Sequence, residues 1–128
     1  METPILLSIV EMGGYPDFST LYRRAGFLPE KAHSMRKAQL WLKRHRPAVV
    51  VAEFHFDPEL RDRMSNLESL LAGLQRYAPA AKVIVFIQQE HRSRLEKVRS
   101  RYSVHGALDY PIDEALLEKL LEQIEGEE

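Results

Sequence analysis

The feature that most constrains this chain is an apolar run that does not alternate, Ala48 to Ala52, followed directly by Glu53. An apolar strand without alternation is covered on both faces, as in the middle of a parallel sheet enclosed by helices. Glu53 would then stand at the carboxyl end of that strand. In open parallel sheets, ligands and chemistry gather outside the carboxyl ends of the central strands, so Glu53 marks the first place to look for function.

Strand-like and helix-like patterns alternate five times along the chain. Two further unbroken apolar runs, Ile5 to Val10 and Val83 to Ile87, predict interior strands, whereas Phe27 to His33 and Val104 to Tyr110 are weaker and predict edge strands. Parallel strands joined by helices require right-handed crossovers. The pattern therefore predicts an α/β fold with a doubly wound, five-stranded parallel sheet, in which the order 2-1-3-4-5 places both weak strands at the edges.

Five helices are expected after these strands. The first covers residues 18–25 and is closed by Gly26, and the second covers 35–46 with Trp41 on its apolar side. The third starts with Asp57 as its N-cap, and the fourth starts with a capping box, Ser93 to Glu96. The last helix starts at Asp113, and its inward-facing residues are expected to be Leu116, Leu117, Leu120, Leu121 and Ile124.

Composition and charge restrict the class of protein. The chain has 128 residues, 45% of them hydrophobic and 29% charged, which is typical of one globular domain over residues 1–128. No apolar run approaches the roughly 20 residues of a membrane helix, and the start has no signal-peptide pattern. The absence of cysteine excludes disulfides and thiolate metal sites and suits a reducing compartment. We therefore expect a cytoplasmic protein that does not bind a membrane.

The net charge of −1 hides an uneven distribution. Residues 91–101 carry five basic side chains against one acid, a net charge of +4, whereas residues 106–128 carry a net charge of −7. The second expected helix has a basic outer face from Arg36 to Arg46. Clustered Lys and Arg side chains suffice for phosphate contacts, but neither aromatic interleaving nor a helix-turn-helix accompanies them, so nucleic acid is not the expected partner.

Two segments resemble the receiver domain of two-component response regulators. One is Arg46 to Glu53 followed by Asp57-Pro58, and the other is Gly106 to Asp113 followed by a leucine-rich helix. The likeness covers the whole chain and is most specific from Gly106 to Leu117. It implies the flavodoxin-like (βα)5 fold, a signalling role and a cis peptide bond at Tyr110–Pro111.

In receivers, an Asp after the third strand accepts a phosphoryl group with the help of Mg²⁺-binding acids, a hydroxyl group and a lysine. The resemblance maps these positions to a pocket of altered residues: Glu11, Glu53, Ile87 or Gln88, and Tyr110. A Glu carboxylate lies one methylene further from the backbone than that of Asp. We therefore expect a degenerate pocket without metal or cofactor, in which Glu11 and Glu53 lie close together and mutual repulsion raises at least one pKa.

Receivers also commonly pair through the fourth helix, the fifth strand and the fifth helix. Here these elements carry opposite charges, so a two-fold axis can set each basic helix against the partner's acidic helix. We expect a homodimer with an apolar centre from Leu95, Val98, Tyr102 and Leu108. The complete predicted surface is Arg92, Arg94, Leu95, Val98, Arg99, Tyr102, Leu108 and Asp109.

The sequence thus predicts a stand-alone receiver-like domain that regulates by protein–protein interaction, without aspartyl phosphorylation and without enzyme activity. A divergent receiver that is still phosphorylated is the main alternative. A small metal-dependent hydrolase using Glu11 and Glu53, or a nucleic-acid-binding module, are further alternatives. The third helix is expected to be about one turn longer than in receivers, roughly 5 Å, with residues 61–66 as its surface.

Overall fold

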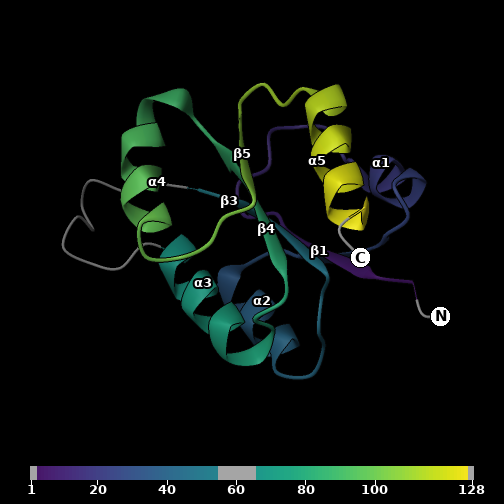
Figure 1. The fold of residues 1–128 in the computed structure, drawn as a ribbon, viewed down its shortest axis with the longest axis horizontal. Helices are drawn as coiled ribbons and strands as arrows, with labels where there is room; N and C mark the ends of the chain where they lie inside the picture. Colours follow the sequence, from purple (N-terminus) through teal and green to yellow (C-terminus); the bar gives the residue numbers. More distant parts are fainter. Residues whose placement is uncertain (1–2, 55–65, 127–128) are drawn as a thin grey trace.

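In a computed structural model of the chain, which describes residues 3–54 and 66–126, five parallel strands form one sheet in the order β2-β1-β3-β4-β5 (Figure 1). The strands are β1 (Ile5–Ile9), β2 (Leu28–Ala32), β3 (Val49–Glu53), β4 (Lys82–Ile87) and β5 (Gly106–Asp109). The helices are α1 (Ser19–Arg24), α2 (Met35–Leu42), α3 (Asn66–Tyr77), α4 (Arg92–Arg99) and α5 (Glu114–Gly126). The predicted doubly wound α/β fold and its strand order are confirmed, with the two weak strands at the edges.

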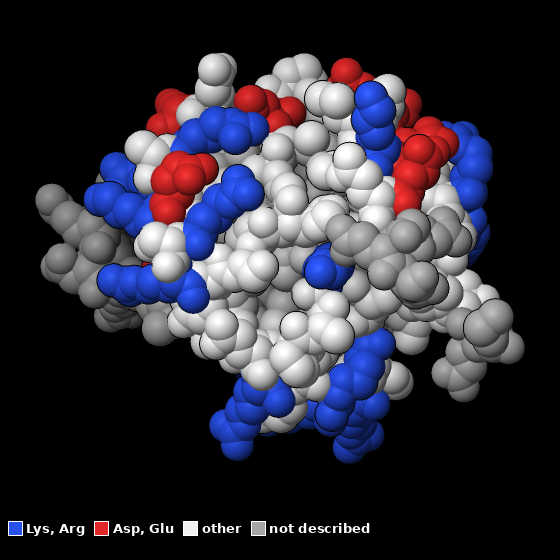
Figure 2. All heavy atoms as spheres, viewed as in Figure 1, with Lys and Arg blue, Asp and Glu red and all other residues white. Residues whose placement is uncertain are grey.

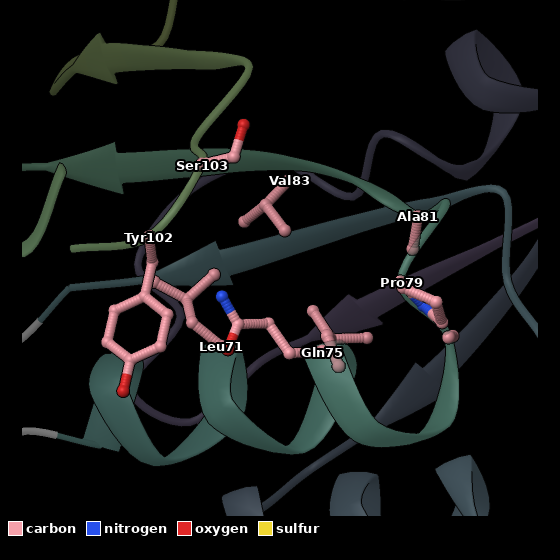
Figure 3. A pocket seen from close by; sticks show the side chains of 9 residues that line it. Leu71, Gln75, Pro79, Ala81, Val83, Tyr102 and Ser103 are labelled. Carbon is pink, nitrogen blue, oxygen red and sulfur yellow. The ribbon is translucent and has the colours of Figure 1, made fainter.

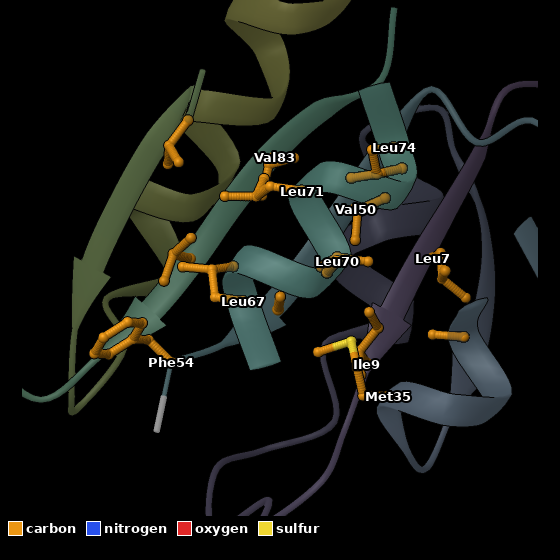
Figure 4. Packing of buried hydrophobic residues seen from close by; sticks show 14 of the residues in the cluster. Leu7, Ile9, Met35, Val50, Phe54, Leu67, Leu70, Leu71, Leu74 and Val83 are labelled. Atoms are coloured by element: carbon orange, nitrogen blue, oxygen red, sulfur yellow. The ribbon is translucent and has the colours of Figure 1, made fainter. Parts of the chain in front are cut away.

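The helices cover both faces of the sheet. α1 and α5 lie on one face, and α2, α3 and α4 lie on the other (Figure 1). All five residues of β3 are buried, because Val49 and Val51 point to the side of α1 and α5 while Val50 and Ala52 point to the opposite side. Figure 4 shows the cluster on the side of α2 and α3. The absence of alternation in the apolar run is therefore explained by burial on two sides.

Local signals set most helix ends. Gly26 has a φ of 98° and follows α1, in the left-handed conformation that favours glycine. Ser34 caps α2 by accepting a hydrogen bond from the backbone N–H of Lys37. Asp113 caps α5, since its carboxylate accepts from the N–H groups of Ala115 and Leu116. The expected roles of Gly26 and Asp113 are confirmed.

Two local expectations were wrong. The capping box at Ser93 does not form, because a 3₁₀ turn, Gln89–His91, follows β4 and runs directly into α4, so that Ser93 already lies inside the helix. Leu116 is 50% exposed rather than inward-facing. The buried stripe of α5 is Leu117, Leu121 and Ile124, and a neighbouring position is rotated by about 100° around the helix axis.

The expected start of the third helix at Asp57, and its extension over residues 61–66, lie outside the described residues except for Asn66, where α3 is seen to begin. Trp41 is half-buried and packs against the core cluster, as expected from its place on the apolar side of α2. Across the described ranges, no helix combines the length and the apolar character needed to cross a bilayer.

Candidate functional site

Glu53 is a buried charge at the carboxyl edge of the sheet. It ends β3, and only 2% of its surface is exposed. Its side chain belongs to the same face as those of Val49 and Val51, toward α1 and α5. A carboxylate in such a place must be hydrogen-bonded, because burying an unpaired charge is prohibitively costly.

The donors come from the loop between β1 and α1. The backbone N–H of Glu11 donates to Oε2 of Glu53 at 3.0 Å, and that of Met12 donates to Oε1 at 3.0 Å. The N–H of Gly13 lies 3.3 and 3.4 Å from the two oxygens, and the hydroxyl of Tyr15 donates to Oε2 at 2.8 Å. Both carboxylate oxygens are therefore occupied by groups of the same chain.

Two glycines explain how the loop reaches this geometry. Gly13 and Gly14 have φ angles of 70° and 84°, which an L side chain adopts only with strain. Left-handed residues in such a turn let successive N–H groups converge on one point and form a cradle for an anion. Here the anion is Glu53 itself, so the carboxylate on β3 fixes the conformation of the loop after β1.

Aromatic rings cover the carboxylate. Tyr15 stacks on Tyr110 with a centroid distance of 6.0 Å and meets Phe86 edge-on at 5.2 Å. Burial raises the pKa of Tyr15, and its hydrogen bond to Glu53 raises it further. Burial also raises the pKa of Tyr110, with a smaller contribution from the charge of Glu53. Both phenols therefore stay neutral at physiological pH. We call these rings, together with Phe18, the aromatic cap.

The structure places the residues predicted for the pocket in different surroundings. The backbone of Glu11 binds Glu53, whereas its side-chain Oε1 is buried and has no hydrogen-bond partner among the described residues. Tyr110 belongs to the aromatic cap, and its peptide bond to Pro111 is cis, as predicted. The predicted rise in a glutamate pKa through repulsion stays a prediction.

The two residues predicted at the position of the receiver's hydroxyl group, Ile87 or Gln88, do not lie in the pocket. Ile87 is fully buried on the opposite face, in the cluster with α2, α3 and α4. Gln88 is exposed beyond the end of β4. Phe86 pairs with Glu53 across the two strands and takes the place beside it, because alternate residues of β4 point to opposite faces. The assignment of Ile87 to the pocket was therefore wrong.

The residues around Glu53 do not fit a magnesium site. Mg²⁺ needs carboxylate oxygens that are free to coordinate it, and those of Glu53 already accept hydrogen bonds from four groups. Nowhere in the described part of the chain do three side chains of His, Asp or Glu gather as metal ligands would.

Known proteins resemble this chain in fold rather than in sequence. No protein-family model matches the sequence, and no curated protein matches it. The signal receiver domain of an HD domain-containing protein from Pseudomonas fluorescens Pf-5 superposes with a TM-score of 0.76 at 16% identity, over 98% of this chain and 97% of that chain. A response regulator from Thermotoga maritima gives 0.75 at 16% identity, over 96% and 98% of the two chains. A sensor protein from Polaromonas sp. JS666 gives 0.71 at 21%, over 96% and 97%.

This chain has the fold of a receiver domain. At these identities the likeness shows the fold alone, and what the site does must be argued from its own residues. Within the receiver fold, Glu53 stands at the end of β3 and the loop that carries Glu11 follows β1, as the sequence mapping expected.

The predicted dimer surface lacks the apolar centre that was expected of it. Leu95, Val98 and Leu108 are at most 8% exposed, because α4 has few apolar residues and uses them in the core of its own protomer. Only Tyr102 of the four is half-buried. Arg92 also forms an ion pair with Asp109 of the same chain at 2.6 Å. Part of the opposite charge that would attract a second protomer is thus already neutralised within one protomer.

A small cavity lies away from Glu53, between the end of α3, the start of β4 and the segment before β5 (Figure 3). Its volume is about 280 Å³, just below the range of about 300–1,000 Å³ of ligand sites. Its walls are mostly apolar, with polar groups from three residues: Gln75, Tyr102 and Ser103. Among the described residues, no charged side chain lines it.

Tyr15 is the site residue that the sequence analysis missed. A buried carboxylate at the end of β3 requires donors, and the loop after the neighbouring strand β1 is the natural source in this strand order. Gly13 and Gly14, followed by a residue with a hydroxyl group, were the available signal.

Proposed function

We propose that this chain is a receiver-like signalling or regulatory domain that acts by binding other proteins, without phosphorylation of Glu53 and without enzyme activity. One observation carries the proposal. The carboxylate at the phosphoacceptor position is 2% exposed and is hydrogen-bonded by the loop after β1.

Phosphoryl transfer depends on positioning and on positive charge that stabilises the transferred group. A carboxylate oxygen that accepts several hydrogen bonds in a covered site is a poor nucleophile toward phosphorus. At the position of the receiver lysine, Tyr110 offers a neutral phenol whose pKa is raised by burial, so it supplies no positive charge. These features favour a domain whose conformation is set by Glu53 permanently rather than by a phosphoryl group.

Such a domain would present partners with a surface of fixed shape around the β1–α1 loop. The side chain of Met12 is exposed in that loop, where the residue as a whole is 77% exposed, and its own backbone N–H donates to Glu53. An exposed apolar side chain on an anchored loop suits contact with another protein. The homodimer through α4, β5 and α5 stays a prediction, and light scattering of the wild type and of Arg94→Glu across a salt series would test it.

Acetyl phosphate with Mg²⁺, followed by intact-mass measurement, tests the main proposal. We expect no phosphoryl adduct on the wild type, and none on Glu53→Asp, because shortening the side chain does not supply the missing lysine. An adduct that maps to residue 53 in the wild type would overturn the proposal and support the phosphorylated alternative. Circular dichroism of both proteins checks that each is folded under the conditions of the reaction.

A further inference from the structure

α2 and the turn that follows it carry four cations on their outer side. Arg36, Lys37, Lys43 and Arg44 are all exposed. With about 100° of rotation per residue, continued through the helical backbone of the C-cap Lys43 into the turn after α2, they fall within about 120° of one another around the helix axis and share one face. We call this set the α2 cationic face.

No acid of the described structure neutralises this face. Residues 31–52 contain six Lys and Arg side chains and no Asp or Glu. Lys31 pairs with Asp17, but among the described residues none of the four cations of the α2 cationic face forms an ion pair. In Figure 2, blue side chains gather at the lower edge of the molecule, near the end of α3 and the turn that follows α2 in Figure 1, with no red side chain among them.

The fold itself does not account for these charges. Cations at the C-terminal end of a helix are stabilised by the helix dipole, which suits Lys43 and Arg44. Arg36 and Lys37 lie in the first turn, where the dipole disfavours positive charge and where α2 has no acidic residue. The first-turn cations therefore oppose the stability of α2, and an external anion would compensate them.

Aromatic side chains do accompany the cations. Trp41 and His45 stack with a centroid distance of 4.6 Å and an interplanar angle of 23°. Beside them, the guanidinium of Arg46 donates to the carbonyl oxygen of Leu42 at the end of α2. The sequence showed no aromatic interleaving, but the two stacked rings flank Lys43 and Arg44 in the chain, and this favours the nucleic-acid alternative.

We propose that the α2 cationic face binds the phosphodiester backbone of nucleic acid without preference for base sequence. Its only exposed large apolar side chain is Leu40, 53% exposed, which is too little for the apolar centre of a protein interface or for insertion into a membrane. Arg36 and Lys43 are two helical turns apart, about 10.5 Å, close to the roughly 12 Å width of the DNA major groove. Cations at the two ends of α2 can thus reach phosphates on both sides of a groove.

This surface is separate from the proposed signalling site. α2 packs on the face of the sheet opposite α1 and α5, whereas Glu53 and the aromatic cap lie on the side of α1 and α5. Failure of the nucleic-acid proposal would leave the proposed function untouched, and the reverse also holds.

Fluorescence anisotropy with a labelled duplex of about 20 base pairs, and with the matching single strand, tests the proposal. For four phosphate contacts, log K against log salt concentration should fall with a slope of about −3.6 on the duplex, or about −2.8 on the single strand. The double variant Arg36→Glu/Lys37→Glu should weaken binding at least tenfold and make the slope shallower by about 2. The tighter of the two ligands identifies the form of nucleic acid that is bound.

A matched control is Arg23→Glu/Lys97→Glu, which changes the net charge equally on exposed positions of α1 and α4. We expect it to weaken binding less than threefold. An equal loss in both double variants would show attraction to net charge alone and would overturn the proposal. So would the absence of binding at low salt, or binding to phosphatidylserine vesicles but to neither oligonucleotide. Circular dichroism confirms that each variant is folded.

Discussion

Glu53 and the α2 cationic face show two opposite ways of holding charge in one small domain. Glu53 is buried, and its carboxylate is met by hydrogen-bond donors from a loop about 40 residues away in the chain. The cations of α2 are exposed, and the described chain provides no acid for them. A charge that the fold neutralises by itself is part of the structure, whereas a charge that it leaves uncompensated is available to a partner.

The difference also supports our proposal that Glu53 in the receiver-like pocket is not phosphorylated. In a pocket that transfers groups, charged atoms must face the reactants. Here the carboxylate faces the N–H groups of its own loop, and the aromatic cap covers it. Under our two proposals, an external charged molecule is met by the outer side of α2 rather than by the carboxylate at the carboxyl edge of the sheet.

The largest expected effect follows from removing the carboxylate. Glu53→Ala leaves several buried N–H groups without an acceptor, and at about 1–3 kcal/mol for each we expect a loss of about 3 kcal/mol or more in the free energy of unfolding. Urea denaturation measures it. The control is Glu30→Ala, at an exposed glutamate of β2, which should stay within about 0.5 kcal/mol of the wild type. A loss below about 1 kcal/mol for Glu53→Ala would show that the carboxylate does not organise the loop.

A smaller loss is expected when the hydroxyl of Tyr15 is removed. Tyr15→Phe keeps the ring of the aromatic cap but deletes a hydrogen bond to a charged acceptor, which typically contributes about 1.5–3 kcal/mol. Tyr102→Phe, at a half-buried tyrosine outside the aromatic cap, is the control and should change stability by less than about 0.5 kcal/mol. Equal losses of stability in both variants would show that the Tyr15 hydroxyl stabilises the fold no more than the Tyr102 hydroxyl does.

Alkaline pH should weaken the same region. Burial raises the pKa of Tyr15, Tyr22 and Tyr110 in the folded protein, whereas an unfolded tyrosine ionises near pH 10. The stability that these phenols contribute is complete below about pH 10 and is lost above it, because the unfolded state then releases protons that the folded state retains. Denaturation midpoints from pH 8 to 11 would show this fall, and Tyr15→Phe should make it shallower. A constant midpoint across this range would contradict the burial of the phenols.

The smallest effect has the opposite sign. Arg36→Glu/Lys37→Glu places acids in the first turn of α2, where the helix dipole favours them by about 0.3–1 kcal/mol each. We expect the variant to unfold at an equal or higher temperature than the wild type, even though it should lose nucleic-acid binding. Thermal unfolding at low ionic strength is the measurement. A clear fall in the unfolding temperature would show that the α2 cations stabilise the fold. The contrast with Glu53 would then no longer hold.

Much of the architecture follows from the sequence because it depends on local patterns. The unbroken run before Glu53 requires burial on two faces, and the weak strand near Pro29 cannot lie in the interior, so the strand order is strongly restricted. The start of α4 was missed because a 3₁₀ turn and a capping box at Ser93 compete for the same residues. Leu116 was misplaced because a leucine-rich helix has more apolar positions than its core-facing stripe can use.

The site was less accessible to prediction. The sequence located Glu53 at the end of a central strand, but which groups meet its carboxylate depends on the backbone angles of Gly13 and Gly14 and on where the loop directs its N–H groups. The role of Tyr15 arises only when the loop folds back over β3. Likewise, whether an acid lies close to the α2 cations depends on which residues are their neighbours in space, and a count of charges along the chain does not show this.

The stack of Trp41 on His45 gives the two regions separate spectroscopic signals. Trp41 is the only tryptophan of the chain, and it lies beside the α2 cationic face. Indole fluorescence therefore reports on α2 alone, without any added label. The aromatic cap contains two of the five tyrosines, so the difference in tyrosine absorbance between the wild type and Tyr15→Phe follows the surroundings of Glu53. Changes in the two regions can thus be followed in the same cuvette.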